Sequence, residues 1–175
     1  MEINVSHLLK SPVGTTRSYD LDSGEVVRLD DENTATIRDG NVRLDRTNTG
    51  VLARGHATAT VTLACARCLE PVEVMPSIEF AEEYEPSIDI ASGRPLPAPE
   101  NDLVFSIAPN HVLDLTEALR QNLIAALPIQ PLCRSDCAGL CPVCGVNRND
   151  TTCDCVVTDV HHPFASLAEL LLDGS

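Results

Sequence analysis

Eight cysteines stand in four closely spaced pairs, and their spacing is the strongest chemical signal in this 175-residue chain. The pairs are Cys65 with Cys68, Cys133 with Cys137, Cys141 with Cys144, and Cys153 with Cys155. Two cysteines separated by two residues can hold one metal ion from a tight turn. In "CPVCG", Gly145 would let the backbone curl so that N–H groups point at the thiolates. Eight thiolates are enough for two tetrahedral metal sites with four ligands each.

The four pairs can be divided between two sites in two ways. In the favoured division the last four cysteines form one site, because the loop "GVNRNDTT" between them is rich in residues that turn tightly. The upstream pair then shares a second site with Cys133 and Cys137, which would clip a hairpin tip to the segment after a helix. The alternative joins Cys133 and Cys137 to Cys141 and Cys144 and leaves four cysteines without a shared site. Counting ligands favours the first division.

Zinc is the expected metal, since it suits four thiolates offered from paired turns. The spacing also allows a structural iron–sulfur cluster. Cys137, Cys141 and Cys144 have the spacing of a radical-SAM motif, but the chain is short for that enzyme's partial barrel and Val143 stands where an aromatic residue is usual. Disulfides are a further alternative. Because the N-terminus lacks the pattern of a secretory signal and no stretch is long enough to span a membrane, we expect a reducing cytoplasm and no membrane partner.

The charge balance bears on the kind of partner. The net charge is −14, from 12 Lys and Arg against 26 Asp and Glu. Such a surface repels phosphates on average and attracts basic proteins, for which the acidic window 79–102 is the candidate contact. Direct RNA binding is the competing hypothesis, because arginines could form a local positive patch near the first cysteine pair. The candidate RNA contacts are Arg43, Arg46, Arg54 and Arg67.

Catalytic residues are not predicted, and we expect the chain not to be an enzyme. A catalytic zinc usually keeps one open coordination position, which two complete four-cysteine sites would not leave. The sequence also shows no phosphate-binding glycine loop, no serine elbow and no nucleophile beside a histidine. A thiol redox switch, or a metal-dependent enzyme of unknown reaction, is the alternative.

The elements that must position the cysteines are mainly strands. Residues 42–45 and 57–63 alternate apolar and polar side chains on either side of the turn "TNTG", as in a hairpin with one buried face. A strand over 69–80 would complete a second hairpin whose tip is the Cys65–Cys68 turn. Further strands are predicted over 3–9 and 103–107.

Two helices are predicted after the strands. The longer begins at Asp114, with Glu117 completing a capping box, and Pro128 ends it. Its apolar residues recur at helical spacing, so one face would pack on the sheet. A short last helix would follow Pro163. The expected fold is therefore α+β: an antiparallel sheet packed by one long helix, with a cysteine-rich, zinc-binding C-terminal tail.

Taken together, "CARCLEPV", "LDLTEALRQNLIAALPIQPLC", "CAGLCPVCG" and the final "CDC" resemble the YceD family of large ribosomal RNA subunit accumulation proteins. Residues 52–74 and 113–155 carry the resemblance most firmly. The family often reads Asn-Leu-Asn where this chain has Arg148 between two asparagines, a departure that leaves the cysteines untouched.

The resemblance implies an accessory role in ribosome biogenesis, supporting the accumulation of large-subunit ribosomal RNA. The partner would be a basic ribosomal protein or the large-subunit rRNA precursor, and the oligomeric state stays open. The predicted organisation is an α+β domain over 1–130, with a flexible acidic loop near 86–101, followed by a zinc-binding tail over 131–175 that packs on it.

Overall fold

The computed structural model describes residues 1–97 and 104–156, and these fall into two compact units. Unit 1 comprises Met1–Leu63 and Pro71–Pro131. Unit 2 comprises Ala64–Glu70 and the described part of Leu132–Ser175, so a seven-residue turn far upstream belongs with the C-terminal segment. The predicted last helix lies outside the described residues.

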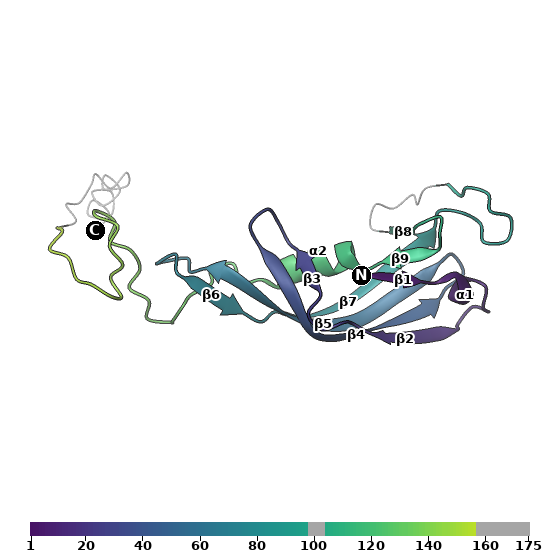
Figure 1. The fold of residues 1–175 in the computed structure, drawn as a ribbon, viewed down its shortest axis with the longest axis horizontal. Coiled ribbons are helices and arrows are strands. Elements are labelled where there is room, and N and C mark those ends of the chain that lie inside the picture. Colours follow the sequence, from purple (N-terminus) through teal and green to yellow (C-terminus); the bar gives the residue numbers. More distant parts are fainter. Residues whose placement is uncertain (98–103, 157–175) are drawn as a thin grey trace, which may run out of the picture. The chain divides into compact units, whose positions relative to one another are not determined.

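Unit 1 is built on a seven-stranded sheet (Figure 1). Its strands are β2 (Thr16–Asp20), β3 (Val26–Arg28), β4 (Thr34–Arg46), β5 (Val51–Ala64), β6 (Pro71–Val74), β7 (Ser77–Pro86) and β8 (Phe105–Ile107). The main path runs β2-β4-β5-β7-β8, while β3 pairs with β4 and β6 with β5. All the pairings with a described register are antiparallel except β7 with β8, which is parallel. The expected antiparallel sheet is therefore confirmed in the main, with one parallel pair at its edge.

The long β4–β5 hairpin follows the alternation read from the sequence. Its core face buries alternate residues of β5 at Val51, Ala53, Ala57, Ala59 and Val61, while Gly55 on the same face is only partly buried. The turn closes because Thr47 Oγ1 accepts a hydrogen bond of 2.9 Å from the Gly50 N–H. A Cβ at Gly50 would lie 1.9 Å from the Tyr84 carbonyl oxygen, so this tight turn requires glycine.

Two strand predictions need correction. The predicted strand over 3–9 is β1 (Glu2–Asn4) followed by a one-turn helix, α1 (Ser6–Leu9). The chain turns there because the Val5 N–H bonds to the His111 carbonyl at 2.9 Å, while β1 pairs with β9 (Val112–Asp114). The predicted strand over 69–80 is split into β6 and β7 around Met75 and Pro76, and Pro76 has no N–H to donate to a sheet.

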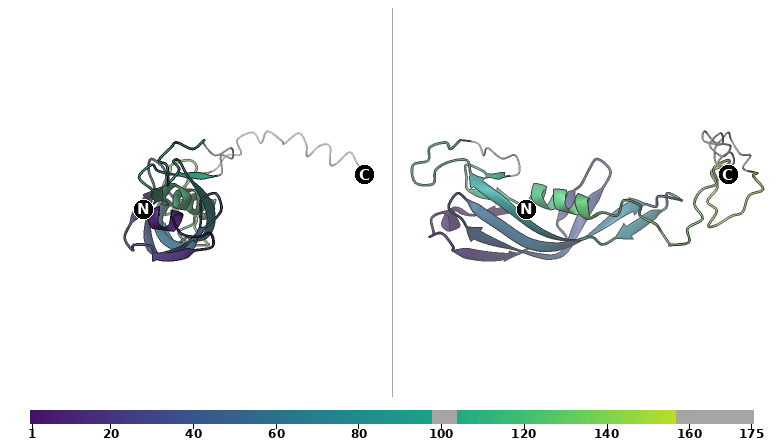
Figure 2. Two further views of the ribbon diagram at one scale, coloured as in Figure 1. Left: turned by 90° about the vertical axis from the view of Figure 1, so that its right-hand side faces the viewer. Right: turned by 180° about the vertical axis from the view of Figure 1, so that it is seen from behind.

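The predicted long helix was also wrong in extent. Helix α2 covers only Thr116–Ala126 and lies against β7 on one face of the sheet (Figure 2). Its buried residues are Ala118, Leu119 and Leu123. The capping box does not form, since the Glu117 carboxylate bonds to Arg120 and Gln121 instead. Asp114 Oδ1 nevertheless accepts a hydrogen bond from the Thr116 N–H at 2.9 Å, which satisfies one free donor of the first turn.

The acidic window 79–102 divides between a strand and a turn. Its first part is the end of β7, and residues 87–97 include a turn closed by an Ile88–Pro95 bridge and by the Asp89 N–H bonded to the Arg94 carbonyl at 2.8 Å. Residues 98–103 lie outside the described part. Among the helices that the structure describes, neither is long and apolar enough to cross a lipid bilayer.

Candidate metal centres

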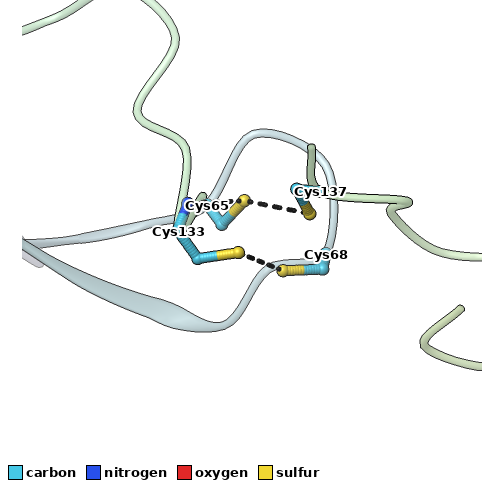
Figure 3. Close-up of side chains that lie close together, drawn as sticks. All are labelled: Cys65, Cys68, Cys133 and Cys137. Carbon is cyan, nitrogen blue, oxygen red and sulfur yellow. Dashed lines mark hydrogen bonds between the residues drawn. The ribbon is translucent and has the colours of Figure 1, made fainter. Parts of the chain in front are cut away.

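Four cysteines from two distant segments meet in the first cluster of unit 2. Cys65 and Cys68 come from the turn after β5, and Cys133 and Cys137 from the segment after α2. All four Sγ atoms lie within 4.8 Å of one another. Figure 3 shows the sulfurs converging, with Cys65 facing Cys137 at 3.9 Å and Cys68 facing Cys133 at 3.6 Å. The structure thus forms the division of cysteines that ligand counting favours.

These sulfur–sulfur distances fit one four-coordinate metal ion. Metal–sulfur bonds of about 2.3 Å, the Zn–S value, give a tetrahedron whose sulfurs are about 3.8 Å apart. A disulfide would need about 2.05 Å between its sulfurs, well below the 3.6 and 3.9 Å in the cluster. A multi-iron cluster lies between its ligands and holds them farther apart. The first cluster can therefore hold a single ion.

The backbone of the first cysteine turn points its N–H groups at a sulfur. The Leu69 N–H bonds to the Cys65 carbonyl at 2.9 Å, and the Cys65 N–H bonds to the Glu70 carbonyl at 2.8 Å. This loop directs the N–H groups of Arg67 and then Cys68 at Cys65 Sγ, and they lower the pKa of that thiol to about 6. The curl requires Leu69 to adopt a φ of 64°, in the left-handed region. The turn is thus shaped to stabilise a thiolate.

The second cluster repeats this turn in its own segment. Its four cysteines, Cys141, Cys144, Cys153 and Cys155, also have all Sγ atoms within 4.8 Å of one another. The Gly145 N–H bonds to the Cys141 carbonyl at 2.9 Å, and the Cys141 N–H bonds to the Val146 carbonyl at 2.8 Å. The N–H groups of Cys144 and then Val143 lower the pKa of Cys141 to about 6. Gly145 takes the left-handed position, at φ 74°.

Within each cluster the remaining thiols cannot all ionise together. Loss of water around its sulfur and the neighbouring Cys137 raise the pKa of Cys133 to about 12. A side-chain hydrogen bond with Cys144, followed by loss of water around the sulfur, raises the pKa of Cys155 to about 12. Four thiolates at these distances repel one another unless a cation lies among them. Each cluster is therefore a set of ligands that a bound cation would complete.

Asn149 contacts a candidate metal ligand and was not singled out from the sequence. Its Nδ2 donates a hydrogen bond of 3.3 Å to Cys137 Sγ, and this bond is the main cause of a lowered pKa at Cys137. Asn149 lies in the loop between the ligand pairs of the second cluster, whereas Cys137 belongs to the first. An asparagine-rich loop between two ligand pairs was the available signal, but its target could not be read from spacing.

Two candidate RNA-contacting arginines are paired inside unit 1. Arg43 and Arg54 lie opposite each other on β4 and β5. Both pair with Asp45: Arg43 Nε lies 2.8 Å from Oδ1, and Arg54 Nη2 contacts Oδ2. Partial desolvation acts to raise the pKa of Asp45, but hydrogen bonds from Arg54, Thr16 and Arg43 outweigh it and lower that pKa to about 2. These arginines therefore have a carboxylate partner within the chain.

The other two candidates bind backbone carbonyls. Arg46 donates to the carbonyls of Leu9 at 3.2 Å and Gly50 at 2.9 Å, and also to that of Thr47. Arg67 donates from Nη1 to the Cys137 carbonyl at 2.9 Å, within unit 2. The structure thus brings together Arg43 and Arg54, while Arg46 and Arg67 tie down loops.

The fold and the two clusters define a β-rich protein with two four-cysteine metal-binding groups. The family model described as "Large ribosomal RNA subunit accumulation protein YceD" matches residues 53–171, and the chain belongs to this family. Similar proteins include uncharacterized proteins of Mycobacterium tuberculosis (strain H37Rv) and Mycobacterium bovis, each 34% identical over 122 residues, which are 70% of this chain and 55% of the relative. A Mycobacterium leprae protein is 34% identical over 115 residues, 61% of this chain and 47% of the relative. The chain spans about half the length of these curated relatives, and no solved structure matches it.

Proposed function

We propose that this protein is an accessory factor of ribosome biogenesis that supports the accumulation of large-subunit ribosomal RNA by binding a basic ribosomal protein. Membership of the YceD family is the observation that carries the ribosomal role. In this proposal the protein acts in the cytoplasm and is not an enzyme.

The proposed metal is zinc, one ion in each cysteine cluster. Its support is the spacing of the first cluster's sulfurs, 3.6 and 3.9 Å, close to the edge of a zinc–thiolate tetrahedron. Four cysteine ligands saturate a tetrahedral ion, so the zinc would stabilise structure and leave no coordination position for a substrate. Elemental analysis of the purified protein should give two zinc ions per chain. Iron, or a coloured protein, would contradict this part of the proposal.

A basic protein suits the charge of the chain better than RNA does. The net charge of −14 repels phosphates, and each zinc with four thiolates adds a formal charge of −2 to its site. The arginines that would have to contact RNA are bound to Asp45 or to backbone carbonyls. The acidic surface therefore favours a positively charged protein as the partner. In this proposal the chain holds that protein until the protein binds RNA.

A pull-down from the native host at low salt tests this function. The expected result is enrichment of one or a few basic ribosomal proteins that remain bound after ribonuclease treatment and are released as salt rises, because charge attraction is screened. A strain lacking the gene should show a lower ratio of large- to small-subunit ribosomal RNA, restored by the wild-type gene. Recovery of large-subunit RNA after the ribosomal proteins are removed would instead support direct RNA binding. An unchanged RNA ratio in the deletion strain would refute the ribosomal role.

A further inference from the structure

One side chain links the two cysteine clusters within unit 2. Asn149 Nδ2 donates to Cys137 Sγ at 3.3 Å, and Asn149 Oδ1 accepts from the N–H of Ala138 at 2.8 Å. It therefore holds both the sulfur and the following backbone of a ligand in the first cluster. Yet Asn149 stands between Cys144 and Cys153, two ligands of the second cluster.

The loop of the second cluster fixes the orientation of this side chain. Asn147 Oδ1 accepts hydrogen bonds from both Asn149 Nδ2, at 2.8 Å, and the Asn149 N–H, at 3.1 Å. The backbone of this loop pairs with the segment between the clusters: Leu140 forms a bridge with Asn147, and the Arg148 N–H bonds to the Gly139 carbonyl at 2.9 Å. A metal that gathers the second cluster's cysteines would close the ends of this loop.

The same segment between the clusters also contacts the first cysteine turn. The Leu140 N–H bonds to the Arg67 carbonyl at 3.0 Å, and a Cβ at Gly139 would lie 3.0 Å from that oxygen. Arg67 in turn donates to the Cys137 carbonyl at 2.9 Å. Hydrogen bonds therefore run without a break from the loop of the second cluster to the ligands of the first.

We propose that Asn149 is an orienting residue for the first metal centre and that the two centres bind metal cooperatively. Metal in the second cluster closes the loop that presents Asn149 to Cys137, and the amide then stabilises the Cys137 thiolate as a ligand. This inference rests on the proposed occupancy of both clusters by zinc. Donors to metal-bound ligands typically change metal affinity by about 10- to 100-fold. By linkage, metal in the first cluster raises the affinity of the second by the same factor as metal in the second raises the affinity of the first.

The test measures zinc retention at the first cluster in the full-length, zinc-loaded protein. A chelator titration removes the metal, and alkylation of Cys65 and Cys68, mapped by mass spectrometry, reports when the first cluster opens. Asn149→Ala removes both the hydrogen bond to Cys137 Sγ and the one from the Ala138 N–H. Asn149→Asp keeps an acceptor for the Ala138 N–H and replaces the donor to Cys137 with a carboxylate oxygen. Arg148→Ala is the matched control, since Arg148 is in the same loop and contributes its backbone N–H to the Gly139 bond.

The expected result is that the first cluster opens at about 10-fold lower chelator concentration in both Asn149 variants, while Arg148→Ala behaves as wild type. A double-mutant cycle supplies the cooperative part. The variant Cys153→Ser/Cys155→Ser, which breaks the second cluster, should weaken zinc binding at the first. Adding Asn149→Ala to it should cost little more, because the loop is already open.

Each outcome separates this proposal from the function on which it rests. Unchanged retention in both Asn149 variants would overturn the role of Asn149. Additive losses in the double-mutant cycle would overturn cooperativity through this residue. Wild-type protein that carries no zinc would refute the metal assignment itself, whereas the ribosomal role is tested separately by the RNA ratio of the deletion strain.

Discussion

The cysteines of unit 2 and the arginines of β4 and β5 each form a cluster of reactive or charged side chains. The two clusters differ in whether the chain itself supplies a partner of opposite charge. The arginines meet a carboxylate, since Arg43 and Arg54 share Asp45. The cysteines meet one another, and bringing four thiols within 4.8 Å makes their joint ionisation unfavourable without a cation. The arginines therefore have their carboxylate partner within the chain, whereas each cysteine cluster could hold a metal ion. This difference supports the proposal that the cysteine clusters bind metal.

The largest effect is expected from the loss of a first-cluster ligand. Cys137→Ser should lower the free energy of unfolding by about 3–5 kcal/mol in the presence of zinc, because the metal's binding energy is part of the folding energy. Its Sγ contact with Cys65 joins residues 72 positions apart. Cys155→Ser should cost about 1 kcal/mol less, since the second cluster closes a much shorter loop. Chemical unfolding with zinc in excess measures both, and equal losses would contradict the loop argument.

Removal of zinc with a chelator tests the same difference between the cysteine clusters and the arginine cluster. Zinc removal should destabilise wild type by more than it destabilises Cys137→Ser, because the variant has already lost one of the centres. Asp45→Asn should respond to the chelator as wild type does, since the arginine cluster uses no metal. A protein whose unfolding is insensitive to the chelator would show that the cysteine clusters hold no metal.

The sequence predicted local features well and long-range hydrogen bonds poorly. The alternation in β5 and the pairing of neighbouring cysteines are local, so the hairpin and the four cysteine pairs could be read directly, whereas the division of those pairs between two clusters was only favoured by ligand counting. The one-turn helix at Ser6–Leu9 could not, because it depends on a bond from Val5 to His111. The contact of Asn149 with Cys137 was out of reach for the same reason. A pattern shows which face a residue occupies, but it does not show which distant atom that residue meets.

Asp45→Asn should destabilise the arginine cluster in a pH-dependent way. The pKa of Asp45 is lowered to about 2 in the folded chain, so its ionised form contributes stability fully above its ordinary value of 3.8. The contribution is lost as the pH falls through about 2. We expect a loss of about 1–2 kcal/mol at pH 7, shrinking as the pH is lowered from 4 towards 2.

The measurement is the free energy of unfolding of wild type and of Asp45→Asn across this pH range. Asp31→Asn is the control, because Asp31 pairs with Arg28 at a fully exposed position and should change stability little. A difference between wild type and Asp45→Asn that does not change with pH would show that packing, and not charge, explains the loss.

Substitution of the residue with left-handed backbone conformation should change stability in opposite directions in the two cysteine turns. Gly145→Ala should cost about 1 kcal/mol, because a side chain is disfavoured at φ 74° although open space surrounds it. Leu69→Gly should stabilise by about 0.5 kcal/mol, since it relieves the same strain at φ 64° and Leu69 is 65% exposed. Unfolding with zinc bound measures both changes. Destabilisation by Leu69→Gly would mean that the leucine side chain makes a contact worth more than its strain.

The smallest effect is expected when the sheet arginines are tested for RNA binding. Arg43→Gln with Arg54→Gln should leave the large-subunit RNA ratio of a complemented deletion strain unchanged, because both guanidinium groups already bind Asp45. Asp45→Asn is the informative partner variant, since it frees both arginines without removing either charge. If these arginines contacted RNA, freeing them would raise that RNA ratio and replacing them would lower it. Opposite shifts in the two variants would therefore overturn the assignment of a protein partner, while no shift in either would leave the arginines a structural role within the sheet.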